Sequence, residues 1–340
     1  MALILGIETT CDETAAAVFS DKPEVLSSVV ATQAELHVRY GGVVPEIASR
    51  AHVERILPVI DEALTKANIR MDDLSAVAVA YTPGLVGSIL VGLAAAKAIC
   101  VAQGIPLLGV NHLEGHIYAC QMIHPEPVFP CIGMVVSGGH TNLFHCRSAI
   151  DLDLVGSTID DAAGEAFDKV ASILKLPYPG GPNIERLARN GNAKAHDFPR
   201  SLMEDGNLDF SFSGLKTAVL YKAYGQNSRR SERELPENEI ADLAASFQHA
   251  VIRVLVEKAR RAVRQFDVRT LCVGGGVAAN GAFRSALEEM AGREKITLVI
   301  PPLALCTDNA AMSAVAVEKF RRGEFDSLDL DAAGGLLRKR

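Results

Sequence analysis

The sequence predicts an α/β protein of two lobes, related by an internal duplication and arranged around a central cleft. The chain has 340 residues, of which 49% are hydrophobic, and this exceeds what a single core usually serves. Each half starts with two apolar stretches around a short polar turn and continues with a strand, a Gly-rich turn and a helix. The same order of elements twice in one chain indicates a diverged duplication.

The two predicted hairpins cover residues 3–19 and 131–146, with polar turns at 8–14 and 137–141. Predicted strands at 76–80 and 271–273 follow them, and each of these strands ends in a Gly-rich turn. Backbone N–H groups in such turns bind anions without lysine, so we expect the four turns to hold phosphate in the cleft. The alternative is that the glycines only permit tight turns.

We expect an N-terminal lobe of residues 1–125 together with a C-terminal helix at about 306–340. The second lobe then spans 126–305 and contains an insertion at about 180–236, which is rich in Pro, Gly and charge. Loops and small helices that face the cleft are predicted for this insertion. After it, Asn238 is predicted to cap a helix whose apolar residues recur at the spacing of one buried face.

The charge balance argues against a chain that coats nucleic acid or lipid through its overall field. The formal net charge is −7 and the pI is about 5.8, so a polyanion must be met by a local basic patch. Such clusters are also ordinary solvated faces. The candidate clusters are Arg229 with Arg230, the group Arg260, Arg261 and Arg264, and the tail Arg338, Lys339 and Arg340.

Cysteine usage and hydropathy predict a cytoplasmic protein. The seven cysteines form no CxxC pair, which fits a reducing compartment better than a disulfide framework. The N-terminus lacks the features of a signal peptide. The longest nearly apolar run, residues 85–96, has 12 residues and is short of the roughly 20 that a membrane span needs.

A metal site is predicted around His112 and His116. Asn111 follows a predicted strand at 106–110 and can cap a helix on which these two histidines lie one turn apart. The pair alone is weak evidence, because it can also be a surface coincidence or a hydrogen-bonded core pair, and no HExxH glutamate is present. Asp308 is the best third ligand, although it can instead be a helix N-cap. Two histidines and one carboxylate leave open coordination positions and suit Fe(II) or Zn(II).

A helix after Asp160 is predicted to carry Asp161, Glu165 and Asp168 on one face, opposite its apolar residues. This face is either solvated or accepts hydrogen bonds from substrate hydroxyls. The following residues, 178–182, bring backbone close to it.

Seven stretches in order resemble the bacterial TsaD family, also known as Gcp or Kae-type proteins, which are tRNA N6-adenosine threonylcarbamoyltransferases. The resemblance spans nearly the whole chain, and its small departures are Thr10 and Ala278, where serine is usual. The stretches are Ile7 to Thr14, Gly41 to Glu46, His112 to His116, Ser137 to Thr141, Gly164 to Lys169, Phe212 to Thr217 and Cys306 to Asn309.

The resemblance implies the actin, sugar-kinase and Hsp70-like (ASKHA) fold. It also implies one divalent metal per subunit at His112, His116 and Asp308, with Fe(2+) favoured and Zn(2+) possible. The residues that would bind the nucleotide part of threonylcarbamoyl-AMP are Val136, Ser137, Gly138, Gly139, His140, Asp168, Gly181, Glu185 and Asn280.

The implied activity is transfer of threonylcarbamoyl from threonylcarbamoyl-AMP to N6 of the adenosine 3′-adjacent to the anticodon, in tRNAs that read ANN codons. We hypothesise that N6 attacks the carbamoyl carbon, with the metal as Lewis acid and AMP leaving; His140 is a conceivable general base. The implied partners are a TsaB-like paralogue in a heterodimer, a TsaE-like ATPase and an enzyme that makes the adenylate. No association with a membrane is expected. The rival functions are a non-catalytic ATP-binding partner of the same fold and, with less support, a metallopeptidase.

Overall fold

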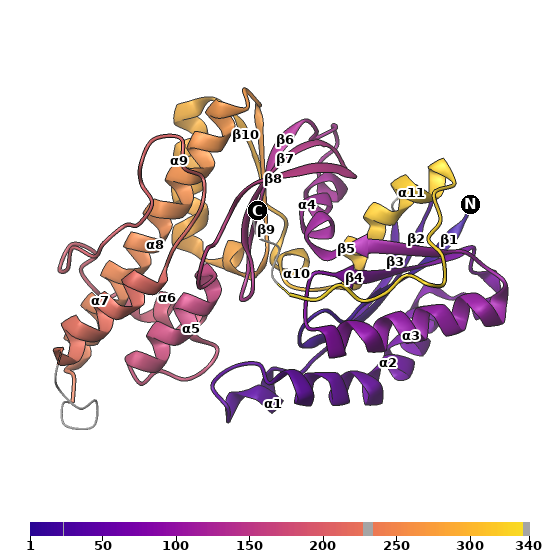
Figure 1. Cartoon of the computed structure of the whole chain (residues 1–340), viewed down its shortest axis with the longest axis horizontal. Helices are drawn as coiled ribbons and strands as arrows, with labels where there is room; N and C mark the ends of the chain where they lie inside the picture. Colours follow the sequence, from indigo (N-terminus) through magenta and orange to yellow (C-terminus); the bar gives the residue numbers. More distant parts are fainter. Residues whose placement is uncertain (23, 227–233, 336–340) are drawn as a thin grey trace. The chain divides into compact units, whose positions relative to one another are not determined.

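The computed structural model describes residues 1–22, 24–226 and 234–335. Within them the chain forms two compact units (Figure 1). The first comprises residues 1–129, 146–152 and 301–335, and the second comprises the described parts of 130–145 and 153–300. Each unit contains one five-stranded sheet with helices, which confirms the predicted α/β class.

The sheet of the first unit has the order β3-β2-β1-β4-β5. β1 pairs antiparallel with β2 from Leu3↔Ser20 to Glu8↔Ala15, which confirms the first predicted hairpin. The central strands are almost wholly buried, as expected for strands covered on both faces. Their bounds are β1 (Leu3–Glu8), β2 (Glu13–Ser20), β3 (Val25–Thr32), β4 (Ala76–Thr82) and β5 (Leu107–Asn111).

The sheet of the second unit repeats this topology. Its order is β10-β9-β6-β7-β8, so the first strand of each half lies between the second and the fourth. β6 runs parallel to β9, as β1 runs parallel to β4, and this equivalence supports the duplication. The strands are β6 (Cys131–Val136), β7 (Thr141–Ser148), β8 (Asp151–Ser157), β9 (Thr270–Gly274) and β10 (Thr297–Val299).

Two long helices, α2 (Pro45–Ala67) and α3 (Val86–Gln103), pack on each other and on the first sheet. Pro45 is the first residue of α2, where its missing N–H costs nothing. By length and composition α3 is apolar enough to cross a membrane, with a mean hydropathy of 1.8. Its residues Leu93, Ala96 and Cys100 belong to the core of the first unit. A helix packed in a protein core can have the same length and apolar composition as a membrane span. The shorter elements of this unit are α1 (Ala34–Val38), η1 (Met71–Asp73), α4 (His112–Ile123), α10 (Leu303–Cys306) and η3 (Ala310–Val315).

The second unit contains the longest helix, α8. It begins at Glu237 after Pro236 as N-cap, so the predicted cap at Asn238 is wrong by two residues. Its predicted apolar face is confirmed, since Leu243, Phe247 and Val251 are fully buried. The helices are α5 (Ala163–Ile173), α6 (Gly180–Ala188), α7 (Ser213–Tyr224), α8 (Glu237–Gln265), η2 (Gly276–Ala279) and α9 (Gly281–Glu294).

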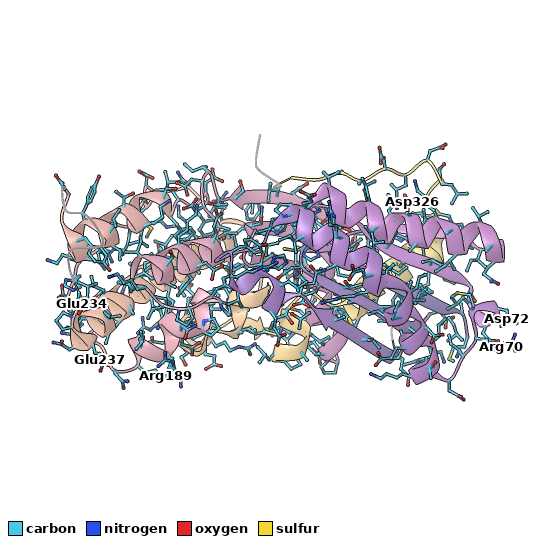
Figure 2. The ribbon with its side chains drawn as sticks, turned by 90° about the horizontal axis from the view of Figure 1, so that it is seen from below. Arg70, Asp72, Arg189, Glu234, Glu237 and Asp326 are labelled. Carbon is cyan, nitrogen blue, oxygen red and sulfur yellow. The ribbon has the colours of Figure 1, made fainter. Side chains whose placement is uncertain are left out.

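The expected C-terminal helix at about 306–340 is wrong within the described residues. Only η3 and the short α11 (Ala316–Arg322) are helical, and Gly323, with φ 68°, ends α11 in the left-handed conformation. Residues 324–335 then run without helix, and Asp326 in this segment is labelled in Figure 2. Asp326 forms a bridge with Leu107 of β5, and its carboxylate accepts from the N–H of Gly109 at 2.7 Å. An edge strand offers free backbone groups, which favour this extended path. Residues 336–340 lie outside the described part.

Candidate functional site

The helix that carries the two histidines starts directly after an edge strand of the first sheet. Asn111 ends β5, and its side chain accepts a hydrogen bond from the N–H of Leu113 at 2.9 Å. The predicted cap is therefore confirmed. His112 and His116 lie one turn apart on α4, with ring centroids 4.6 Å apart, and both side chains are buried.

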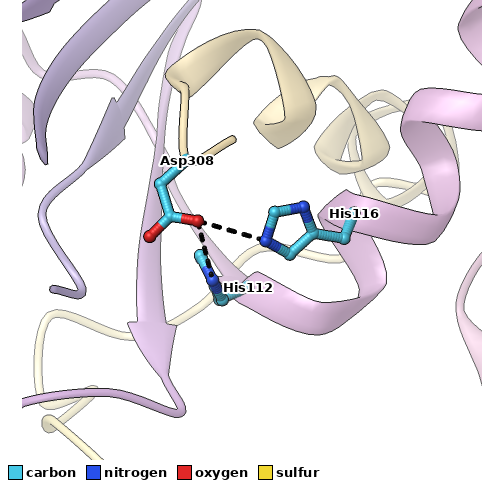
Figure 3. A group of neighbouring side chains, drawn as sticks. All are labelled: His112, His116 and Asp308. Carbon is cyan, nitrogen blue, oxygen red and sulfur yellow. Dashed lines mark ion pairs between the residues drawn. The ribbon is translucent and has the colours of Figure 1, made fainter. Parts of the chain in front are cut away.

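The structure brings Asp308 to this pair from a segment almost 200 residues later in the sequence (Figure 3). Its Oδ1 lies 3.2 Å from His116 Nε2 and 3.6 Å from His112 Nε2. One ligand atom from each of the three residues lies within 4.8 Å of the others. The alternative role of Asp308 as a helix cap is wrong, because Asn309 caps η3 by accepting from the N–H of Met312.

The polar atoms of this cluster suit a metal ion. His116 is fully buried, and within the described part of the chain neither of its ring nitrogens has an aligned hydrogen-bond partner. Buried polar atoms are rarely left in this state. A cation shared by His116 Nε2, His112 Nε2 and Asp308 would use the lone pairs that face one another, and this donor set suits Fe(II) or Zn(II).

A buried carboxylate orients the first histidine. Glu8 ends β1 with no exposed surface, and its Oε2 lies 3.0 Å from His112 Nδ1, while Thr10 Oγ1 lies 3.1 Å from the same nitrogen. Donation from Nδ1–H to Glu8 leaves the Nε2 lone pair directed at Asp308, as in carboxylate–histidine–metal sites. Burial lowers the pKa of His112, but the carboxylates of Glu8 and Asp308 outweigh it and raise the pKa to about 9. Without a metal His112 is therefore protonated at neutral pH, and a metal ion would free the Nε2 lone pair by displacing this proton. Burial lowers the pKa of His116.

Replacing Glu8 by Gln tests this support. The amide keeps the shape but loses the charge that fixes the tautomer of His112, so we expect metal affinity to fall by about 10- to 100-fold. Competition with a chelator measures this affinity. Glu35→Gln, on the exposed part of α1, is the matched control, and equal affinities of the two variants would contradict the role of Glu8.

The predicted nucleotide-binding loop of the second unit follows β6. Ser137 and His140 close the turn between β6 and β7, because the N–H of Ser137 donates to the carbonyl oxygen of His140 at 2.8 Å. The side chain of Ser137 also accepts from the N–H of His140 at 3.1 Å. A Cβ on Gly138 or Gly139 would meet nothing within 4 Å, and neither residue has a positive φ. The chain itself therefore does not require glycine here, and the open space suits a ligand.

Hydrogen bonds connect the other predicted nucleotide-binding residues within the same unit. Asp168 Oδ1 accepts from the N–H of Gly180 at 2.7 Å, which joins α5 to the start of α6. Glu185 on α6 accepts from the N–H of Gly281 at 3.1 Å. Asn280 caps α9 and donates from Nδ2 to Gln248 Oε1 at 2.8 Å. Gly181, like the glycines of the 137–141 turn, has open space around its Cα.

The predicted carboxylate face is confirmed as helical only for Glu165 and Asp168, because α5 begins at Ala163 and Asp161 precedes it. Asp161 and Glu165 both contact Lys169 at 2.7 Å, and Asp161 also contacts Lys216 at 3.1 Å. Although burial opposes it, these two lysines lower the pKa of Asp161. Only Asp168 is bonded to the backbone of the neighbouring Gly-rich segment.

The predicted basic cluster on α8 is neutralised by ion pairs. Arg260 and Arg261 lie within 2.8 Å of Glu257, and Arg264 lies 2.7 Å from Glu294. The spacing of the arginines alone did not show that Glu257 on α8 and Glu294 on α9 pair with them. The clusters Arg229 with Arg230 and Arg338 to Arg340 lie outside the described residues.

Two sheets of the same topology, with a His-His-Asp cluster that can hold one metal ion in one of them, define a duplicated protein of the actin, sugar-kinase and Hsp70-like class. Solved structures support this fold. Component A of (R)-2-hydroxyglutaryl-CoA dehydratase from Acidaminococcus fermentans matches with a TM-score of 0.55 at 16% identity, over 95% of this chain and 99% of that chain. Full-length HypF in its phosphate- and nucleotide-bound form matches with a TM-score of 0.62 at 12% identity, over 96% of this chain and 56% of that one.

The sequence comparisons are more specific. The family model of tRNA N6-adenosine threonylcarbamoyltransferase, TsaD, matches residues 24–315. Proteins of that name from Rhodopirellula baltica and Bacillus subtilis are each 53% identical to this chain; the matches cover 99% and 95% of the chain, and 97% and 93% of the relatives. The chain belongs to the TsaD family.

Proposed function

We propose that this protein transfers the threonylcarbamoyl group from threonylcarbamoyl-AMP to N6 of the adenosine 3′-adjacent to the anticodon in tRNAs that read ANN codons. The observation that carries the proposal is the match to enzymes of this name along almost the entire chain. The His112, His116 and Asp308 cluster and the open glycine turn support the proposal, because such a reaction uses a metal site and a phosphate-binding turn.

We propose that residues 136–140, with Asp168, Gly181, Glu185 and Asn280, hold the nucleotide part of the substrate. Backbone N–H groups of the 137–141 turn are suited to the phosphate, which stays negative as AMP leaves. His112, His116 and Asp308 would hold a metal ion, which would supply a Lewis acid there; Fe(2+) is favoured and Zn(2+) is the alternative. His140 is the candidate general base, since it lies in the same turn and is mostly buried.

Nucleoside mass spectrometry on tRNA from cells depleted of this protein tests the function. We expect threonylcarbamoyladenosine to disappear and to return with the wild-type gene, but not with His112→Ala. An unchanged amount in depleted cells would exclude the transferase and favour the non-catalytic ATP-binding alternative.

We propose a TsaB-like paralogue as a partner, with a TsaE-like ATPase and an adenylate-forming enzyme acting in the same cytoplasmic pathway. Several large apolar side chains are exposed on the packed helices α2 and α3, including Val53 at 64%, Leu57 at 68% and Val101 at 67%. Val53 and Leu57 lie one turn apart on the same face of α2, and adjacent exposed apolar side chains are typical of interaction surfaces. We expect Leu57→Asp to weaken heterodimer formation in gel filtration by at least about 10-fold, whereas Glu62→Gln on the same helix leaves it unchanged. If Leu57→Asp and Glu62→Gln formed the heterodimer equally well, the proposal that α2 binds the partner would be contradicted.

A further inference from the structure

Four basic side chains converge on one region of the second unit. Lys194, Arg200 and Arg253 lie around His249 on α8, and all four residues are exposed. Arg253 lies one turn after His249 on α8, and Asn192 and His196, which flank Lys194, both hydrogen-bond to Ser246, about one turn before His249. Burial and then the positive charges of Arg253, Arg200 and Lys194 lower the pKa of His249. We call these four residues the α8 basic patch.

The patch has little opposing charge. Arg200 Nη2 is 3.9 Å from Asp197, whose side chain is 98% exposed, and among the described residues Lys194 and Arg253 have no carboxylate within ion-pair distance. The arginines further along α8 differ, since Glu257 and Glu294 neutralise them. Like charges held together without counter-charges repel one another, and a bound anion relieves this repulsion.

A hollow of about 780 Å³ adjoins the patch, between residues 197–203, α8 and α9. Arg200 and Arg253 belong both to the patch and to the lining of this hollow. The lining near α9 contains Arg293, which is paired with Glu289. Asp197, which lies 3.9 Å from Arg200, also lines the hollow, so the positive charge without a paired carboxylate among the described residues is that of Arg253.

The patch is connected to the predicted nucleotide site through α8. Gln248, which precedes His249, is buried and accepts the hydrogen bond from Asn280. Successive residues of a helix are about 100° apart, so the same turn of α8 presents Gln248 to the Asn280 loop and His249 to solvent. A polyanion bound at the patch would lie one helical face away from the loop that starts α9.

We propose that the α8 basic patch binds phosphates of the tRNA backbone, which is a deepening of the proposed transferase function. RNA carries one negative charge per nucleotide, and arginine guanidinium groups form paired hydrogen bonds with phosphate oxygens. A protein of net charge −7 does not attract RNA through its overall field, so a local basic patch with few counter-charges is needed to bind it. Binding here is independent of base sequence.

The test is the affinity of the full-length protein for an unmodified tRNA transcript that reads an ANN codon, measured by fluorescence anisotropy at several salt concentrations. We expect the triple variant Lys194→Gln, Arg200→Gln, Arg253→Gln to bind about 10- to 100-fold more weakly. Because each lost phosphate contact removes about 0.9 from the slope of log affinity against log salt, the slope should fall by about 2 to 3. Arg253→Lys, which keeps the charge, should bind nearly as the wild type does.

The matched control removes the same charge from exposed ion pairs outside the patch: Lys66→Gln, Arg70→Gln, Arg147→Gln (Figure 2 labels Arg70 and its partner Asp72). Equal tRNA affinities of the two triple variants would overturn the proposal. It would also be overturned if the patch variant bound tRNA as the wild type does but no longer bound a partner protein in gel filtration. Single-turnover transfer at saturating tRNA distinguishes a failure of the patch proposal from a failure of the proposed transferase function. The patch variant should retain it, whereas absence of transfer by wild type would reject the transferase function and leave the binding result intact.

Discussion

Asp308→Ala is expected to remove the bound metal and to lower the single-turnover rate of threonylcarbamoyl transfer by roughly 1000-fold, which corresponds to about 4 kcal/mol. Asp308 is the only carboxylate of the three-residue cluster, and its Oδ1 faces both histidine Nε2 atoms. Without it, two neutral imidazoles hold a divalent cation only weakly. Metal content after gel filtration, measured by inductively coupled plasma mass spectrometry, reports binding separately from activity.

The control for this prediction is His124→Ala. His124 follows the end of α4 and contacts the carbonyl oxygen of Glu126, so its loss changes the number of histidines near the helix without touching the cluster. We expect this variant to retain one metal per chain. If Asp308→Ala kept the metal and His124→Ala lost it, the assignment of the ligands would be wrong.

The parts of the fold that the sequence predicted are those with short-range causes. The hairpins are continuous apolar stretches interrupted by polar turns, and the buried face of α8 recurs at helical spacing, so both were visible without tertiary information. The two sheets then confirmed the duplication, because their strand orders match. The histidine pair on α4 was likewise a local pattern, fixed by the cap at Asn111.

The features that sequence reasoning missed depend on contacts between distant segments. The extended path of residues 324–335 is set by the free edge of β5, which no local pattern in the tail reveals. Arg264 of the predicted basic cluster pairs with Glu294 of α9, which the arginine spacing does not reveal. The pairs of Arg260 and Arg261 with Glu257 are local and were available from the helical spacing. The support of His112 by Glu8 was also missed, although a carboxylate at the end of an otherwise apolar strand was an available signal.

Gly275→Ala is expected to be the most destabilising of the proposed substitutions in the second unit. Gly275 has φ 91° and ψ 159°, a region that is essentially restricted to glycine. A Cβ there would clash with the carbonyl oxygen of Val136, and backbone cannot move aside as a flexible side chain does. Backbone strain and overpacking together cost about 3 kcal/mol or more, which lowers the melting temperature by about 6–12 °C.

Gly276→Ala is the matched control for this substitution. A Cβ on Gly276 meets nothing within 4 Å, and its φ is not positive, so we expect its stability to lie within about 1 kcal/mol of the wild type. Gly275 lies between β9 and η2, and η2 leads to Asn280. The Cα of Gly275 lies close to the backbone of Val136 at the end of β6. Its substitution should therefore also raise the KM for threonylcarbamoyl-AMP, while Gly276→Ala should not. Equal melting temperatures for the two variants would show that the contact with Val136 does not constrain the loop.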